Sequence, residues 1–316
     1  MNKKITLSYV LTTHDKLPYL KEVMKRLLEN VQPDEEIVIA DGASTDGTVE
    51  YLTELFNQGK IHQFISEPDF GEAHGFNKGI LMARGELIKI LTDDDVFDHM
   101  VIAECKEYMI SNVSIDLIFA NICYLNHSLS SDKLLLFKSY EIWFKEWADR
   151  KVENCFFCGI SILIRKNSLS FIGLLDTSFK HVDLEYSIRV TSKKANIAFC
   201  SHIMTCAILN EMSISRNFEY IQKKEVERVS AYYNYISLVG EKPVIPEPKN
   251  IIYRILKKLG IYNPVPKKEY YQDYNYELNG NIVYEDLPDL FNKIPKFITE
   301  YNDANKLEFI SNININ

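Results

Sequence analysis

The sequence lacks the features that mark several broad classes of protein. No apolar run approaches the roughly 18 residues that a membrane span requires. No stripe of Lys and Arg is present, and the 316 residues carry a net charge of −8, which argues against nucleic acid as a partner. No G-x-G-x-x-G follows a predicted strand, which argues against a dehydrogenase, and we find no internal repeat.

Cysteine is scarce, with six residues in the chain, and only Cys155 and Cys158 have the C-x-x-C spacing. A structural zinc site takes four ligands, and no further ligand pair accompanies these two, so the sequence argues against zinc. The opening residues, MNKKITLSYVLTTHDK, lack the long apolar segment of a signal peptide. We therefore expect reduced thiols in a cytoplasmic protein.

The sequence does contain a regular alternation of strand and helix patterns over roughly its first 110 residues. Apolar runs predict strands at 5–13, 35–41, 61–66 and 86–92, and apolar residues at helical spacing predict helices at 17–30, 44–56 and 71–85. Such alternation is typical of an α/β fold, in which parallel strands are covered by helices on both faces. A hydrophobic content of 46% is sufficient for a large core.

The C-terminal quarter has a different composition. The segment 241–250, EKPVIPEPKN, holds three prolines and predicts a linker. We expect a first domain over 1–225 and a mainly helical extension over 226–316, with one helix at 287–303. In 251–261, apolar residues at helical spacing lie next to basic ones, which predicts an amphipathic helix that either packs on the first domain of the chain or lies against a membrane surface.

Acidic residues follow several of the predicted strands. Asp15 follows the first strand, Asp41 ends the second, Asp69 follows the third, and Asp93–Asp95 follow the fourth. Because ligands of such sheets bind at the carboxyl ends of the strands, we expect these carboxylates to gather on one edge. Too few Lys or Arg residues accompany them, which indicates a bound cation. The alternative is a solvated acidic turn.

Five further segments occur in order: VLTTHDK at 10–16, ADGASTDGT at 40–48, EPDFGEAHGFNKGILMARGELI at 67–88, TDDDV at 92–96 and GLLDTSFKHVDLEYSIR at 173–189. In this order they resemble the motifs of the family 2 glycosyltransferases, which are inverting enzymes with the GT-A fold. Together they span about residues 4–220. The sequence departs from the family at Thr12, usually proline, at Asp15, usually asparagine, and at Val182, often glutamate. His74 stands where related sequences often have aspartate.

The resemblance implies a metal site in the aspartate triplet. Asp94 would be the direct ligand of Mn²⁺ or Mg²⁺, Asp93 would face the ribose, and Asp95 would help to hold the ion or its waters. Three consecutive aspartates leave this register open by one residue. A divalent ion bound to both phosphates would offset the charge of the leaving diphosphate.

The resemblance also implies a catalytic base and a set of residues that bind the nucleotide sugar. Asp183 matches the aspartate that takes the proton of the acceptor hydroxyl, with Glu185 as a less favoured rival and a helix cap as the structural alternative. The binding residues would be Thr13, Asp15, Asp41, Asp69, Asn77, Arg84 and Asp93. Their alternatives are a strand end for Thr13, a cap for Asp41, a turn for Asp69, a structural hydrogen bond for Asn77 and a surface ion pair for Arg84.

The predicted function is a metal-dependent inverting glycosyltransferase that moves a hexose or N-acetylhexosamine from a UDP-sugar. The acceptor would be a saccharide or lipid-linked saccharide in bacterial polysaccharide, lipopolysaccharide or capsule synthesis. The enzyme would be cytoplasmic, with peripheral contact at the inner face of the membrane through 251–261 as an option. The alternatives are a sugar-1-phosphate nucleotidyltransferase and a catalytically silent nucleotide-sugar-binding protein. The first would want a glycine-rich phosphate loop, which TTHDKLP at 12–18 lacks.

Overall fold

The computed structural model describes residues 4–126, 133–137, 139–210, 225, 228–229, 231–233 and 275–313. The predicted linker at 241–250 and the predicted amphipathic helix at 251–261 lie outside these residues. Within the described part of the chain, no helix combines the length and the apolar composition needed to cross a membrane.

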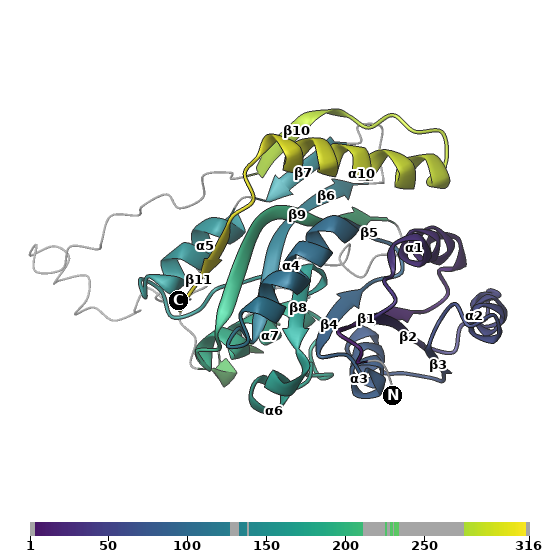
Figure 1. The fold of residues 1–316 in the computed structure, drawn as a ribbon, viewed down its shortest axis with the longest axis horizontal. Helices are drawn as coiled ribbons and strands as arrows, with labels where there is room; N and C mark the ends of the chain where they lie inside the picture. The colour runs from purple at the N-terminus through teal and green to yellow at the C-terminus, as the bar shows by residue number, and fades with distance from the viewer. Residues whose placement is uncertain are drawn as a thin grey trace, which may run out of the picture.

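The first part of the chain alternates strand and helix, as the sequence predicts (Figure 1). The elements are β1 (Leu7–Thr13), α1 (Leu17–Asn30), β2 (Glu35–Asp41), α2 (Thr48–Asn57), β3 (Gln63–Ser66), α3 (Glu72–Met82) and β4 (Leu87–Leu91). The four strands are parallel and lie in the order β3-β2-β1-β4. Thr13 pairs with Asp41, and Asp41 pairs with Ser66. The carboxyl ends of β1, β2 and β3 therefore lie at one edge of the sheet.

The rest of the chain extends the same sheet with mainly antiparallel strands. The elements are β5 (Val96–Phe97), α4 (His99–Ser111), β6 (Leu117–Asn126), β7 (Lys133–Phe137), α5 (Ser139–Ala148), the 3₁₀ turn η1 (Gly159–Ser161), β8 (Ile162–Arg165), the 3₁₀ turn η2 (Lys166–Ser168), α6 (Leu169–Ile172), α7 (Val182–Ser192), β9 (Ile197–Leu209), β10 (Asn275–Asn281), α10 (Leu287–Ala304) and β11 (Phe309–Ser311). Strand β8 lies antiparallel between β4 and β6, while β9 runs parallel to β6.

The C-terminal segment 275–313 is part of this sheet. Strand β10 pairs with β7, β11 pairs with β9, and α10 contacts both β9 and α1. The sequence predicts α10, but it gives no signal for β10 or β11. Helix α10 remains the longest element of 275–313, in agreement with the mainly helical extension that the sequence predicts, and β10 and β11 add two strands to it. The division of the chain at residue 225 stays a prediction.

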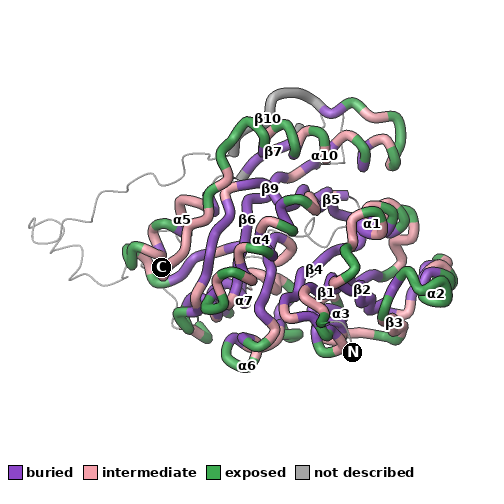
Figure 2. Tube along the Cα trace, viewed as in Figure 1, coloured by how far each residue is buried: buried purple, intermediate pink, exposed green. Residues whose placement is uncertain are grey.

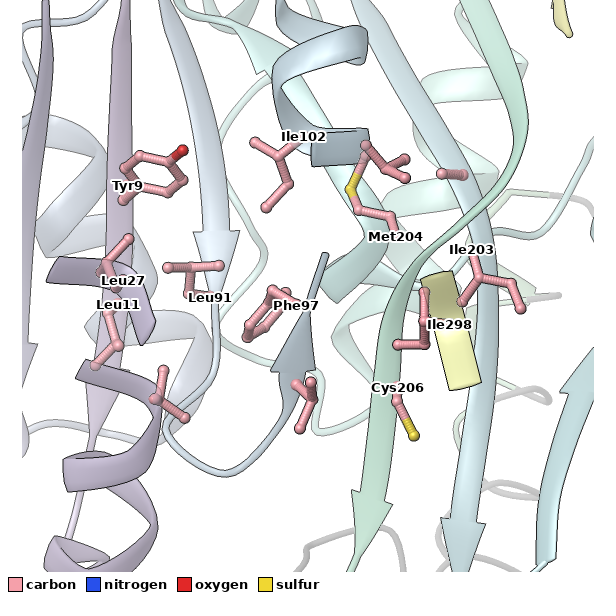
Figure 3. Close-up of a cluster of buried hydrophobic side chains, with 14 of the residues drawn as sticks. Tyr9, Leu11, Leu27, Leu91, Phe97, Ile102, Ile203, Met204, Cys206 and Ile298 are labelled. Atoms are coloured by element: carbon pink, nitrogen blue, oxygen red, sulfur yellow. The ribbon is translucent and has the colours of Figure 1, made fainter. Parts of the chain in front are cut away.

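One buried cluster connects the N-terminal and C-terminal parts of the fold. Figure 3 shows Tyr9 and Leu11 of β1 in the same cluster as Met204 of β9 and Ile298 of α10. The central strands are purple in Figure 2, and β1, β2 and β4 are buried along their whole length. Burial on both faces explains why these strands have continuous apolar sequences instead of an alternating pattern.

Helix α3 packs unusually close to β1 because two glycines face that strand. A Cβ atom at Gly79 would lie 2.5 Å from Cγ1 of Val10, and one at Gly75 would lie 2.1 Å from Oγ1 of Thr12. Real Cβ contacts of that length do not occur, so the helix and strand can approach this closely only with glycine. This approach brings the start of α3 to the edge where β1 ends.

Gly79→Ala is expected to destabilise the protein, because an added methyl group in a packed core costs about 1–3 kcal/mol. The loss should exceed the gain of about 1 kcal/mol that alanine offers over glycine in a helix. Denaturant unfolding of the variant measures it. Leu81→Ala, on an exposed position of the same helix, is the control. Equal stability of Gly79→Ala and the wild type would contradict the close packing.

Candidate functional site

The aspartate triplet lies in the turn between β4 and β5, and it is buried. Asp93, Asp94 and Asp95 are 5–6% exposed. Leu91 before the turn and Phe97 after it both lie in the apolar cluster of Figure 3, which fixes the turn at its two ends. Burial raises the pKa of Asp93 to about 6 and the pKa of Asp95 to about 7. A solvated acidic turn is therefore excluded.

Asp93 and Asp94 share a cationic partner, Lys16. Its Nζ lies 2.6 Å from Oδ2 of Asp94 and 3.4 Å from Oδ1 of Asp93. Oδ2 of Asp94 also accepts a hydrogen bond from the Asn210 side-chain amide at 2.8 Å, and Asp93 accepts one from the backbone N–H of His14 at 3.4 Å. One lysine therefore lies among the carboxylates, and the sequence analysis did not single it out. Lys16 was overlooked because it begins the first helix and looks like a surface residue.

Asp95 has its carboxylate oxygens bound to the protein itself. Oδ1 accepts the backbone N–H of Ile208 at 2.8 Å, and Oδ2 accepts the hydroxyl of Thr92. These bonds attach the aspartate turn to β9. The geometry therefore favours a structural role for Asp95, and the ligand role predicted for it is the weakest of the three.

A divalent cation fits the remaining pair of carboxylates. Asp93 and Asp94 already direct one oxygen each at a single positive charge, and carboxylate oxygens are the donors that Mg²⁺ and Mn²⁺ prefer. Among the described residues, no three acidic, His or Cys side chains are already arranged as metal ligands. A cation held here would complete its coordination with phosphate or water oxygens, as Mg²⁺ commonly does.

Asp41 lies on the same edge and is 1% exposed. Its carboxylate accepts hydrogen bonds from the Ser44 N–H at 3.0 Å, the Ser44 hydroxyl at 2.5 Å and the Ser66 hydroxyl at 2.6 Å. These three bonds hold the loop after β2 against the end of β3. A carboxylate has about four acceptor positions, so at most one remains for a nucleobase.

Three more predicted residues lie near this edge. Asp15 accepts the Thr45 N–H at 2.6 Å, which connects the loops after β1 and β2. The Thr13 hydroxyl is buried and has no hydrogen-bond partner among the described residues. Asp69 accepts the Gly71 N–H at 2.8 Å in the turn before α3. Asp69 also lies close to the loop after β2, because a Cβ atom at Gly42 would be 3.0 Å from Oδ2 of Asp69.

The structure does not bring Arg84 to this edge. Its Nε lies 2.8 Å and one terminal nitrogen 2.7 Å from Oε2 of Glu36. Glu36 is at the start of β2, whereas Asp41 is at its end. Five residues of strand, at about 3.3 Å each, separate the two sites. The prediction that Arg84 binds the nucleotide sugar is therefore corrected: the residue forms the ion pair that was its structural alternative.

Asn77 has a backbone partner. Its amide donates to the carbonyl of Leu175 at 2.8 Å and accepts the Leu175 N–H at 3.0 Å. This pair attaches α3 to the segment that leads into α7. Asn77 therefore positions the two halves of the site, and the structure favours its structural alternative over direct donor binding.

Asp183 lies in the first turn of α7, as predicted. Its Oδ2 accepts the backbone N–H of Gly159 at 3.2 Å, and its Oδ1 is 3.9 Å from Nε2 of His181. The Asp183 side chain is 27% exposed, so a ligand can reach it. Glu185, the rival base, is buried and forms two short bonds with Arg189, which makes it structural.

Glu72 lies near both the Asp93–Asp94 pair and Asp183, and the sequence analysis did not find it. Burial, together with the negative charges of Asp183 and Asp94, raises the pKa of Glu72 to about 8. Glu72 therefore lies within electrostatic reach of both. An acidic residue in the first turn of a helix is already explained by the helix dipole, so the sequence carries no separate signal for this role.

A buried lysine connects two segments of the site. Lys89 of β4 is fully buried, and its Nζ donates to the carbonyls of Ile90, at 2.8 Å, and Ile160. Ile160 follows Gly159, the residue whose N–H binds Asp183. Lys89 therefore joins the strand that ends in the aspartate triplet to the turn that holds Asp183.

The stability of the wild type relative to Lys89→Met is expected to rise between pH 7 and pH 10. Burial lowers the pKa of Lys89 from 10.5 to about 7. In this range the unfolded chain holds a proton that the folded chain lacks, so raising the pH favours the folded state. The difference in unfolding free energy between the two proteins can rise by at most about 1.4 kcal/mol per pH unit. Denaturant unfolding of both proteins at several pH values measures it, and parallel curves would contradict the buried neutral amine.

The family model and three of the curated relatives that match this chain are glycosyltransferases. A family model described as "Glycosyl transferase family 2" matches residues 8–173. A cholesterol galactosyltransferase of Borreliella burgdorferi is 21% identical over 288 residues, which cover 89% of this chain and 76% of that protein. Coverage of other curated relatives is smaller: the chain spans 29% and 43% of the length of two further glycosyltransferases.

Two solved structures share the fold at low sequence identity. The mannosyltransferase PcManGT of Pyrobaculum calidifontis, in complex with GDP-Man and Mn²⁺, has a TM-score of 0.59 at 13% identity, over 84% of this chain and 78% of that one. S. aureus TarS 1–349, in complex with UDP-GlcNAc, has a TM-score of 0.52 at 13% identity, over 71% and 66%. At these identities the likeness shows the fold alone.

Proposed function

Because the chain belongs to glycosyl transferase family 2, we propose that it is an inverting, metal-dependent enzyme that takes a sugar from a nucleotide-sugar donor. The fold is that of the GT-A glycosyltransferases, and family membership makes the protein a transferase. The donor, the metal and the acceptor are parts of the proposal. The observation that carries it is the convergence of Asp93 and Asp94 on one buried cation at the end of β4.

The donor is proposed to be a UDP-sugar, with a hexose or N-acetylhexosamine as the transferred group. Asp93 and Asp94 would hold Mn²⁺ or Mg²⁺, which offsets the charge of the departing diphosphate. Asp41, at the end of β2, would accept a hydrogen bond from an N–H of the base, and Thr13, Asp15 and Asp69 would line the same edge. TarS with UDP-GlcNAc and PcManGT with GDP-Man and Mn²⁺ support a nucleotide sugar and a metal.

Asp183 is proposed as the base that takes the proton of the acceptor hydroxyl. Inversion requires the acceptor to attack from the side opposite the leaving diphosphate. Asp183 is partly exposed, and the Gly159 N–H holds one of its oxygens. Its position in the first turn of a helix favours the ionised form, which is the form a base needs.

The acceptor is proposed to be a saccharide or a lipid-linked saccharide in surface polysaccharide synthesis. The Borreliella burgdorferi relative is named for a lipid acceptor, cholesterol, which supports an acceptor at a membrane. Peripheral contact of a cytoplasmic enzyme with the inner face of the membrane, through 251–261, remains part of this proposal.

A panel of nucleotide sugars tests the proposal. The purified chain is incubated with UDP- and GDP-sugars and Mn²⁺, and both hydrolysis of the donor and the shift in melting temperature are measured. We expect one or more UDP-sugars to be hydrolysed slowly and to stabilise the protein. If only GDP-sugars stabilise the protein, the donor is a GDP-sugar and not a UDP-sugar. The absence of any hydrolysis or stabilisation across the panel would contradict the donor class.

A further inference from the structure

Lys16 occupies a position that its local structure does not favour. It is the N-cap residue of α1, and it makes no side-chain capping bond. The N-terminus of a helix carries a partial positive charge, so a cation there is unfavourable. Its side chain is only 18% exposed. The ammonium group is therefore held in place by Asp93 and Asp94, whose charges provide the compensating attraction.

The electrostatics of Lys16 agree with this geometry. Burial alone would lower the pKa of Lys16, but the carboxylates of Asp93 and Asp94 raise it above the ordinary value. The lysine therefore keeps its charge inside the site. Two buried carboxylates side by side would otherwise repel each other, and the ammonium reduces that repulsion.

The ammonium and a divalent cation would draw on the same two carboxylates. Nζ of Lys16 is 2.6 Å from Oδ2 of Asp94, and Asn210 donates to the same oxygen at 2.8 Å. A Mg²⁺ or Mn²⁺ ligated by this oxygen would stand roughly 2.1 Å from it. The two positive charges would then lie close together in a buried site, where repulsion is strong. That repulsion disfavours binding of both cations at the Asp93–Asp94 pair.

We propose that Lys16 is an internal competitor of the divalent cation, which holds Asp93 and Asp94 in the metal-free protein and leaves when the metal binds. The inference rests on the proposed function, because it assumes a metal at these carboxylates. A displaced ammonium would find a new anionic partner in the diphosphate of the donor. Metal and nucleotide would then bind cooperatively, and the lysine would keep the affinity for the metal alone low.

Titration of Mn²⁺ alone into the full chain tests the proposal by calorimetry. The proteins compared are the wild type, Lys16→Met, Lys16→Gln and the control Lys25→Met, which alters an exposed lysine of the same helix. We expect both Lys16 variants to bind Mn²⁺ about tenfold more tightly than the wild type, within the usual range of coupling between sites. Mn²⁺ should also raise their melting temperatures more. Lys25→Met should match the wild type.

The second measurement is the effect of UDP on Mn²⁺ affinity. UDP should strengthen Mn²⁺ binding in the wild type, and strengthen it less in Lys16→Met and Lys16→Gln. Unchanged or weaker Mn²⁺ binding in the Lys16 variants, with normal binding in the wild type, would overturn the competition and leave the proposed function intact. If no protein binds Mn²⁺ with or without UDP, both the competition and the metal-dependent function are wrong.

Discussion

Asp94→Ala is expected to abolish the metal-dependent part of UDP binding. Asp94 is 6% exposed and shares Lys16 with Asp93, so it is the carboxylate best placed to hold a cation. Even residues that only support metal ligands cost about 10–100-fold in affinity when they are changed. We therefore expect the affinity for UDP in the presence of Mn²⁺ to fall by at least about tenfold, to the value of the wild type without metal, as measured by calorimetry.

The comparison must separate loss of the metal from loss of the fold. Removing Asp94 leaves the ammonium of Lys16 with Asp93 as its remaining partner in the triplet, so some loss of stability is expected, and Asp94→Asn provides a variant of the same shape. Glu29→Ala, on an exposed position of α1, is the control for a change of net charge. If Asp94→Asn melts normally and still binds UDP in a Mn²⁺-dependent way, Asp94 is not the ligand.

Asp183→Asn is expected to bind UDP and Mn²⁺ as the wild type does but to lose sugar transfer. The amide keeps the size of the side chain and can still accept the Gly159 N–H, but it cannot take a proton. General base catalysis contributes about 10²–10⁴-fold to a rate, and we expect kcat to fall within that range. Initial rates of transfer with a saturating donor measure this effect, and calorimetry with UDP and Mn²⁺ measures the binding.

The outcome distinguishes a base from a binding residue. Equal losses of UDP affinity and of transfer would remove Asp183 from the base role, because they would indicate damage to the donor site. Transfer at the wild-type rate would point to another base. Glu72, in electrostatic reach of both Asp183 and Asp94, would be the next residue to test.

The first half of the fold could be predicted because its residues repeat one local pattern. Helix α1 begins and ends at the predicted residues, and β2 covers the predicted segment EEIVIAD. Each strand ends in polar residues, and parallel strands bring those ends to one edge. Asp41, Asp93 and Asp94 therefore lie at that edge, because a strand-end position is fixed by topology as soon as the strand is correct.

The second half depends on contacts that are distant in the sequence. Strand β10, with the sequence NYELNGN, has no apolar alternation, and it becomes a strand by pairing with β7. Helix α4 was not predicted, although Asp98 caps it by accepting the N–H groups of Met100 and Val101. Its apolar residues are spread around the helix, so the periodicity that marks α1 is missing.

The direction of a side chain was the hardest feature to predict from sequence. Arg84 and Asn77 both lie in the segment that resembles the family pattern, yet Arg84 binds Glu36 and Asn77 binds Leu175. In the sequence Lys16 looks like a solvated helix residue, but in the structure its side chain points toward Asp93 and Asp94. A short motif fixes where a residue stands in the chain, whereas packing decides which neighbour it meets.

The central claim is that a divalent cation, held by the carboxylates at the end of β4, binds the diphosphate of the donor. Calorimetric titration of UDP into the wild-type chain, first with Mn²⁺ and then after chelation with EDTA, tests this claim most directly. We predict binding in the presence of Mn²⁺ that weakens by at least about tenfold after chelation, within the usual coupling between two ligands. Equal affinity for UDP in the two titrations would contradict it.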